Sequence, residues 1–136
     1  MFDLVGFYTG GDLLKQGAFY ESVLSPLGYR LLWNVAETDG TGRLIFGTGE
    51  QNCPFFVIAK GRQNPDWWRP GQQQGMSAIH LAFRAPSKEA VDRFHEIGLR
   101  EGARNNGDPG IRRGTYYAAF LIDADSNGIE AGIYLS

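Results

Sequence analysis

The chain has few cysteines and no long apolar run, and each shortage excludes a class of protein. Its 136 residues include one cysteine, Cys53, so no disulfide framework can form within the chain. No stretch reaches the roughly 18 consecutive apolar residues of a membrane span, and residues 1–11 lack the basic leader of a signal peptide. We therefore expect a cytoplasmic protein that does not enter a membrane.

Positive charge is also in short supply. The sequence has 13 Lys+Arg against 15 Asp+Glu, which gives a formal net charge of -2. Nucleic-acid surfaces need clustered basic side chains, so we expect no nucleic-acid partner. Apolar side chains make up 43% of the residues and aromatic ones 13%, a composition typical of a globular protein. The length fits a single domain spanning residues 1–136.

The predicted elements of the first half form a strand, a helix and three further strands. Asp12 is a helix cap after the first strand, and the helix runs to about Leu24, before "SPLG" ends it. The strands are expected at residues 3–9, 29–36, 43–46 and 54–59. A linker rich in glycine, proline and amides follows at residues 61–76, with Trp67 and Trp68 as candidates for covering an apolar edge or a subunit interface.

The same order of elements begins again after the linker. A strand over 77–85 is followed by a helix capped by Ser87, a loop that holds "GDPGIRRGT", and strands near 115–123 and 129–135. A shift of 75 residues places Asp12 on Ser87 and "FYESVL" on "FHEIGL". We therefore predict an α+β fold of two βαβββ units, about 1–60 and 77–136, that form a curved sheet with a central cleft.

One histidine and one glutamate share the predicted bare face of the second unit. In "SAIHLAF", Ile79, Leu81 and Phe83 alternate with His80 and its small neighbours, and "IEAGIYL" places Glu130 on the face opposite Ile129. A solvated strand position explains either residue alone. Together they predict a pair able to move a proton near neutral pH. His95 is explained by a polar position on the second helix.

Other residues are candidates for contact with a ligand in the cleft. Val5 is the counterpart of His80 under the 75-residue shift, and Arg113 can clamp a carboxylate with two hydrogen bonds. Core packing or a solvated loop explains these positions as well, and the sequence leaves both interpretations open. The full set of predicted ligand contacts is Val5, Phe7, Phe56, Arg113, Tyr117 and Tyr134.

Three blocks of the chain resemble the vicinal oxygen chelate superfamily, which groups glyoxalases, bleomycin-resistance proteins and extradiol dioxygenases. They are "GAFYESVLSPLGYRLL", "SAIHLAFRAPSKEAVDRFHEIGLREGA" and "NNGDPGIRRGTYYAAFLIDADSNGIEAGIY". The resemblance implies the paired βαβββ fold, a small-molecule ligand, a homodimer and a divalent metal. His80 and Glu130 match two of the family's metal ligands, whereas Val5 stands where the family has a histidine. The family's acidic turn is present as "DADSNG".

These departures leave two functions open. The first is a glyoxalase-like enzyme of the lyase, isomerase or dioxygenase type, with a metal site reduced to His80 and Glu130. Two protein ligands would hold a divalent ion weakly or not at all, because catalytic metals generally take about three. The alternative is a metal-free protein that binds or sequesters a small molecule, as bleomycin-resistance proteins do.

Overall fold

The computed structural model describes residues 2–61 and 79–136. Apart from Gly61, the predicted linker over 61–76 lies outside the described residues, as do Trp67 and Trp68. The domain boundaries given above therefore stay a prediction. Within the described parts of the chain, no helix is long and apolar enough to cross a membrane.

The first unit consists of one sheet and one helix. β1 (Leu4–Tyr8) leads into α1 (Leu13–Leu24) and a short 3-10 turn, and β2 (Arg30–Ala36), β3 (Gly42–Gly47) and β4 (Phe55–Lys60) follow. As predicted, Asp12 caps α1, because its carboxylate accepts a hydrogen bond from the Lys15 amide at 3.0 Å. The strands are ordered β1-β4-β3-β2, with β1 parallel to β4.

The second unit repeats this arrangement. β5 (His80–Arg84) leads into α2 (Lys88–Arg100), which Ser87 caps through the Ala90 amide at 3.1 Å, and β6 (Arg104–Arg113), β7 (Tyr116–Ile122) and β8 (Gly128–Tyr134) follow. The order is β5-β8-β7-β6, with β5 parallel to β8. The predicted α+β class with two βαβββ units is therefore confirmed. The strands form two separate four-stranded sheets instead of one continuous curved sheet.

β6 corrects the prediction that "GDPGIRRGT" is a loop. The strand is ten residues long and includes Pro109; six of its residues pair with β7, and the register shifts at several points between them. A proline lacks the amide donor of a ladder and is tolerated on an edge strand or at a bulge. β6 is the outer strand of its sheet. The sequence predicted a loop here because glycine and proline are common in loops. Local sequence does not show that a segment will be an edge strand, where both residues are tolerated.

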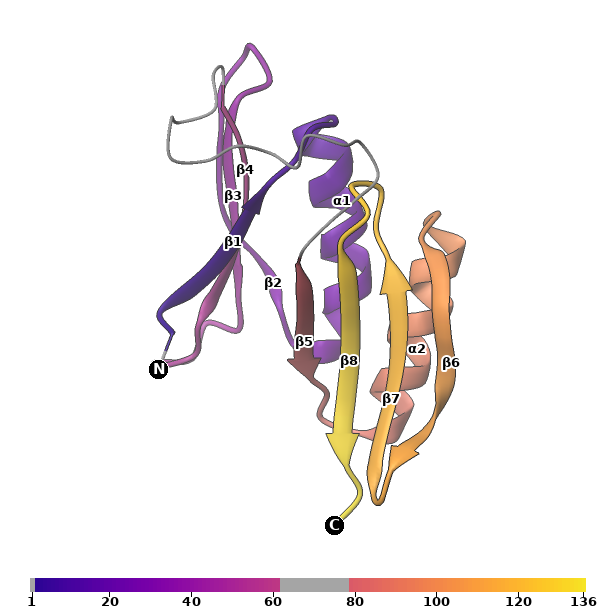
Figure 1. The fold of residues 1–136 in the computed structure, drawn as a ribbon. Coiled ribbons are helices and arrows are strands. Elements are labelled where there is room, and N and C mark those ends of the chain that lie inside the picture. Colours follow the sequence, from indigo (N-terminus) through magenta and orange to yellow (C-terminus); the bar gives the residue numbers. More distant parts are fainter. Residues whose placement is uncertain (1, 62–78) are drawn as a thin grey trace.

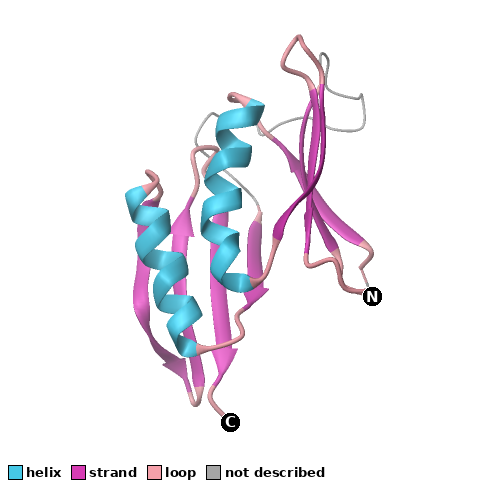
Figure 2. Ribbon diagram, turned by 180° about the vertical axis from the view of Figure 1, so that it is seen from behind, coloured by secondary structure: helices cyan, strands magenta, loops and turns pink. Residues whose placement is uncertain are grey.

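One hydrophobic core joins the two units. The two helices lie side by side behind the β5-β8-β7-β6 sheet in Figure 1 and in front of it in Figure 2. Tyr20 of α1 packs 5.0 Å from Phe56 of β4, and Phe56 packs 5.5 Å from Phe83 of β5, measured between ring centroids. Each sheet thus buries one face toward the helices, and no helix of the described residues covers the other face.

Candidate functional site

His80 and Glu130 lie together on the uncovered face of the second sheet. In the parallel pairing of β5 and β8, Glu130 lies opposite Ala82, two residues along the strands from the pair of His80 and Gly128. The imidazole Nε2 of His80 is 2.6 Å from a carboxylate oxygen of Glu130. The His80 side chain is 53% exposed and that of Glu130 only 10%, so solvent reaches the pair mainly at the histidine.

Tyr116 of β7 completes this group. Its hydroxyl donates a 2.5 Å hydrogen bond to the second carboxylate oxygen of Glu130. Burial, followed by this hydrogen bond, raises the pKa of Tyr116 to about 12. Tyr116 therefore remains a protonated donor throughout the physiological pH range, and both oxygens of Glu130 have a partner.

Two glycines of β8 make the space in which these side chains lie. A Cβ atom at Gly132 would meet the Tyr116 hydroxyl at 2.1 Å, and one at Gly128 would meet Nδ1 of His80 at 2.9 Å. A side chain at either position would displace the ring above it. The small residues that flank Glu130 in the sequence are thus a condition for the contacts that Glu130 makes.

A cavity of about 560 Å³ opens beside Glu130. Predicted contacts Arg113 and Tyr134 both line it, and Arg84 and Tyr116 join them. Its full lining is Ala82, Phe83, Arg84, Arg113, Tyr116, Glu130, Gly132, Ile133 and Tyr134. All of these residues belong to the second unit. Among the described residues, the cavity is thus built by one sheet and not by a cleft between the two units.

Three predicted cleft walls lie on the other face of their sheets. Phe7 packs 5.8 Å from Tyr20 in the core beneath α1, and Phe56 is buried beside the same ring. The Tyr117 hydroxyl donates to Asp92 of α2 at 2.5 Å, and this hydrogen bond raises the pKa of Tyr117 to about 12. The structure thus corrects the predicted position of all three, because alternation along a strand sends neighbouring side chains to opposite faces.

The counterpart of His80 in the first unit is Leu4 and not Val5. β1 and β5 have the same length and pair equivalently, with Leu4 opposite Phe55 as His80 is opposite Gly128. The strands therefore correspond by 76 residues (80 minus 4), although the helix caps correspond by 75 (87 minus 12). Val5 has the same strand parity as Phe7 and so faces the helix side.

The ligand set does not fit a tightly held metal ion as it stands. Among the described residues, no group of three or more His, Cys, Asp or Glu side chains is placed to share an ion. Nitrogen and oxygen ligands of one tetrahedral zinc lie about 3.3 Å apart, given bonds of ~2.0–2.2 Å. The distance from His80 Nε2 to the Glu130 carboxylate oxygen is 2.6 Å, which is shorter than this separation. The two groups hold each other by a direct hydrogen bond.

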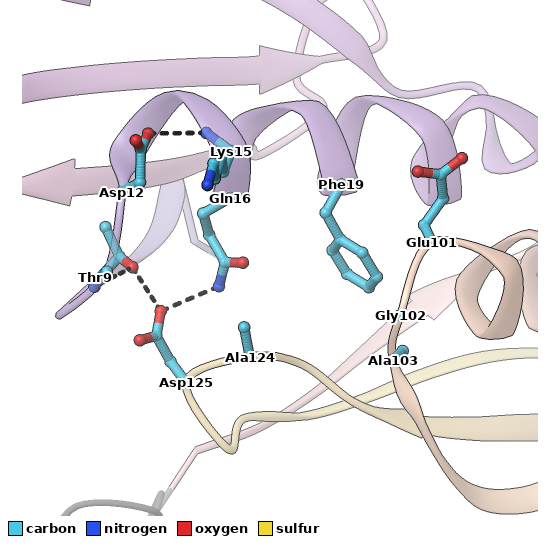
Figure 3. A pocket seen from close by; sticks show the side chains of 11 residues that line it. Thr9, Asp12, Lys15, Gln16, Phe19, Glu101, Gly102, Ala103, Ala124 and Asp125 are labelled. Atoms are coloured by element: carbon cyan, nitrogen blue, oxygen red, sulfur yellow. Dashed lines mark hydrogen bonds between the residues drawn. The ribbon is translucent and has the colours of Figure 1, made fainter.

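The acidic turn before β8 connects the two units. Asp123 accepts from the buried Tyr20 hydroxyl at 2.5 Å, and Asp125 accepts from Thr9 at 2.5 Å and from Gln16 at 3.0 Å. Figure 3 shows Thr9, Gln16 and Asp125 in this arrangement, at one end of a second cavity of about 290 Å³. Burial, followed by the charge of Asp123, raises the pKa of Tyr20 well above its ordinary value. These contacts anchor the turn from which β8 carries Glu130.

Sequence reasoning did not single out Tyr116 and Arg84. A signal for Arg84 was present, because it follows His80 by four positions on the same strand face. Tyr116 had no local signal, since its contact with Glu130 depends on how β7 and β8 pair. His95 is buried in α2, where its Nε2 lies 2.9 Å from the side-chain oxygen of Asn105. It is a structural contact between α2 and β6.

No protein-family model and no curated protein matches the chain. Solved structures do. A glyoxalase/bleomycin resistance protein from Albidiferax ferrireducens T118 aligns with a TM-score of 0.69 and 28% identity, over 97% of both chains. A glyoxalase/bleomycin resistance protein/dioxygenase family enzyme from Burkholderia phytofirmans PsJN aligns with a TM-score of 0.69 and 19% identity, over 98% of both chains.

A mutant of the fosfomycin resistance protein FosX from Listeria monocytogenes is a further structural match. Its structure, in complex with Mn(II) and a dihydroxypropylphosphonic acid, aligns with a TM-score of 0.64 and 16% identity, over 96% of this chain and 87% of that one. The likeness to these structures spans nearly the whole of the chain described here. The resemblance to the vicinal oxygen chelate superfamily that the sequence predicted is therefore confirmed.

Proposed function

We propose that this protein is a glyoxalase-like enzyme of the lyase or isomerase type, in which His80 and Glu130 transfer a proton to or from a small molecule. The observation that supports the proposal most directly is the 2.6 Å contact between His80 and Glu130, because Glu130 also lines a ligand-sized cavity. Proton transfer needs a base and a group that orients it, and this pair supplies both.

The hydrogen bonds give each side chain a separate role. An ionised Glu130 accepts from Nε2–H of His80, which favours the tautomer whose Nδ1 carries a lone pair. A carboxylate orients the base in the same manner in the catalytic triad of serine hydrolases. Tyr116 donates to the other oxygen of Glu130 and keeps the carboxylate in place. When His80 takes a proton from the ligand, Glu130 stabilises the imidazolium that forms.

We include weak metal binding in the proposal and no step that needs a metal. The superfamily resemblance implies a divalent ion, and the FosX complex contains Mn(II). Among the residues that the structure describes, His80 and Glu130 are the two candidate ligands at this site, and each already hydrogen-bonds the other. A third ligand and separation of the pair would both be required for tight coordination. The dioxygenase alternative, which depends on a redox metal, is therefore less well supported than proton transfer.

The second candidate is a metal-free binding protein of the bleomycin-resistance type. It is favoured by the engagement of both Glu130 oxygens, because a carboxylate held on both sides also serves as a fixed wall for a ligand. Both candidates use the same cavity and a small-molecule ligand. They differ in whether a bond to hydrogen in that ligand is broken.

Hydrogen exchange in D₂O separates the candidates. Hydroxyacetone and pyruvate are suitable probes, since each has carbon-bound hydrogen next to a carbonyl and only pyruvate is charged. Proton NMR is expected to show enzyme-dependent loss of these hydrogens for at least one probe, and His80→Gln and Glu130→Gln should each slow the loss about 100-fold or more. Glu96→Gln, exposed on α2, is the matched control. Saturable binding without exchange would support the binding protein. The absence of both binding and exchange would refute the proposal.

We also propose that the protein is a homodimer. Large apolar side chains lie exposed on the uncovered face of the first sheet: Leu4 is 55%, Trp33 52% and Val35 40% exposed. An apolar sheet face of this kind favours a second copy as its cover. Light scattering should give about twice the 15.1 kDa chain mass, and Trp33→Glu should shift the mass toward that of one chain. A single-chain mass for the unaltered protein would refute the dimer. The cytoplasmic location expected from the sequence stays a prediction.

A further inference from the structure

We propose that the cavity beside Glu130 takes an anionic ligand, whose carboxylate or phosphoryl group is held by Arg84 and Arg113. The inference extends the proposed function, because it names the substrate class of the same site. It rests on the positions and partners of Arg84 and Arg113. The proton transfer proposed for His80 and Glu130 involves neither arginine.

Arg84 is the last residue of β5 and faces the same side of the sheet as His80. Its backbone lies opposite Gly132 in the parallel pairing with β8, and the space that Gly132 leaves free on this face holds the phenol of Tyr116. The residue is exposed and its side chain lines the cavity that also contacts Glu130. Arg84 therefore presents its charge to whatever occupies this space.

Arg113 reaches the cavity from the opposite edge of the sheet. It ends β6, pairs with Tyr116, and its guanidinium carbon lies 5.5 Å from the centre of the Tyr116 ring. Tyr116 in turn is bonded to Glu130. β5 and β6 are the two edge strands, three strand spacings or about 14 Å apart. The two arginines thus flank the central strands and the acid–base pair.

The charges that line the cavity are unbalanced. Arg84, Arg113 and Glu130 are its charged lining residues, and Glu130 is engaged by both His80 and Tyr116. Within the described parts of the chain, neither arginine forms an ion pair. Arg112 differs, because it donates to the Asp108 carbonyl oxygen and lies over the Phe120 ring. Arg84 and Arg113 are the guanidinium groups that remain for a ligand.

Arginine suits this task at any working pH. Its guanidinium stays charged and offers a rigid fork of donors that matches two oxygens of a carboxylate or phosphate. An acidic ligand would neutralise the excess positive charge, whereas a cationic ligand would meet two like charges. An anion held between the arginines also places the remainder of the ligand in the cavity beside the Tyr116 phenol and Glu130. The arrangement selects anions and orients them toward the proton-transfer pair.

Binding of small anions to the intact protein tests the inference without requiring the natural substrate. Acetate and inorganic phosphate are titrated at constant ionic strength while backbone amide signals are followed by NMR, with uncharged acetamide as the matched probe for acetate. We expect saturable shifts for acetate, phosphate or both, centred on residues 82–84, 113–116 and 130–134, and none for acetamide. A preference for phosphate assigns a phosphoryl ligand, and a preference for acetate a carboxylate.

Substitutions locate the effect on the two arginines. Arg84→Gln and Arg113→Gln should each weaken anion binding about tenfold, the loss of one charge-assisted contact. Arg93→Gln, exposed on α2, should leave it unchanged within about twofold. No saturable binding of either anion up to about 100 mM, or equal effects of all three substitutions, would overturn the inference. Anion binding without hydrogen exchange would support the inference while refuting proton transfer, so the two failures are distinguishable.

Discussion

Gly132→Ala is expected to break the contact between Tyr116 and Glu130 although neither of these two residues is substituted. The added Cβ would lie 2.1 Å from the Tyr116 hydroxyl oxygen and 2.4 Å from Cζ, and its three nearest neighbours all belong to that side chain. Gly132 does not have a positive φ, so the backbone accepts alanine. The phenol ring must therefore move away from Glu130.

The magnitude follows from two opposing effects. A hydrogen bond to a charged group contributes about 1.5–3 kcal/mol, and water in the cavity can replace the phenol in part, which favours the lower figure. Alanine in place of glycine within a strand contributes about 0.5–1 kcal/mol in the stabilising direction. The net expectation is a loss of about 1 kcal/mol in the free energy of unfolding, measured by urea denaturation.

The phenol titration gives a second, independent readout of Gly132→Ala. The folded-state pKa of Tyr116 is raised to about 12, so its stabilising contact is fully present below pH ~10, the unfolded value, and is lost as pH rises toward 12. In the variant, Tyr116 should ionise closer to pH 10, seen as phenolate absorbance. Its matched control is Gly110→Ala, whose Cβ would meet only the Asp108 carbonyl oxygen at 4.0 Å.

A double-mutant cycle can refute this reasoning. In a Tyr116→Ala background the ring that Gly132→Ala displaces is absent, so the cost of the glycine substitution should vanish or become a gain. If Gly132→Ala costs the same with and without the tyrosine, its effect does not come from the contact with Tyr116. An unchanged phenolate titration in the single variant would lead to the same conclusion.

Three further predictions concern the frame around the site. Tyr20→Phe should lower the free energy of unfolding by about 1–3 kcal/mol, because the buried Asp123 loses its hydroxyl donor; chemical denaturation measures the loss, and a change below ~0.5 kcal/mol would count against it. Gly98→Ala should destabilise by about 1–3 kcal/mol, because its Cβ would lie 2.1 Å from a methyl carbon of the fully buried Leu121; a thermal midpoint equal to that of the unaltered protein would argue against this packing. Val5→His should add no bound zinc, since the position faces the helix side; zinc bound stoichiometrically by this variant alone would contradict the strand register.

Local signals predicted the frame of the fold well. Asp12 and Ser87 act as helix caps in the structure as in the sequence, because a capping side chain bonds an amide only three residues away. The alternation around His80 and Glu130 also predicted their shared face, which follows from the period of two along a strand. Both kinds of signal are contained within a few neighbouring residues.

Features that depend on strand pairing could not be predicted in the same way. Tyr116 and Tyr117 are adjacent aromatic residues, and only the register against β8 shows that Tyr116 faces Glu130. Phe7 was assigned to a cleft because a uniform 75-residue shift placed it on the face of His80, whereas the first strands correspond by 76 residues (80 minus 4). One residue of difference in a loop moves every side chain of a strand to the other face.

The metal content of the dialysed protein tests the central claim most directly. That claim is that His80 and Glu130 work as a hydrogen-bonded pair and not as ligands of a resident ion. Elemental analysis of the native protein should find far less than one divalent ion per chain, and Glu130→Gln should leave that value unchanged. One tightly held ion per chain that disappears in His80→Gln would contradict the account.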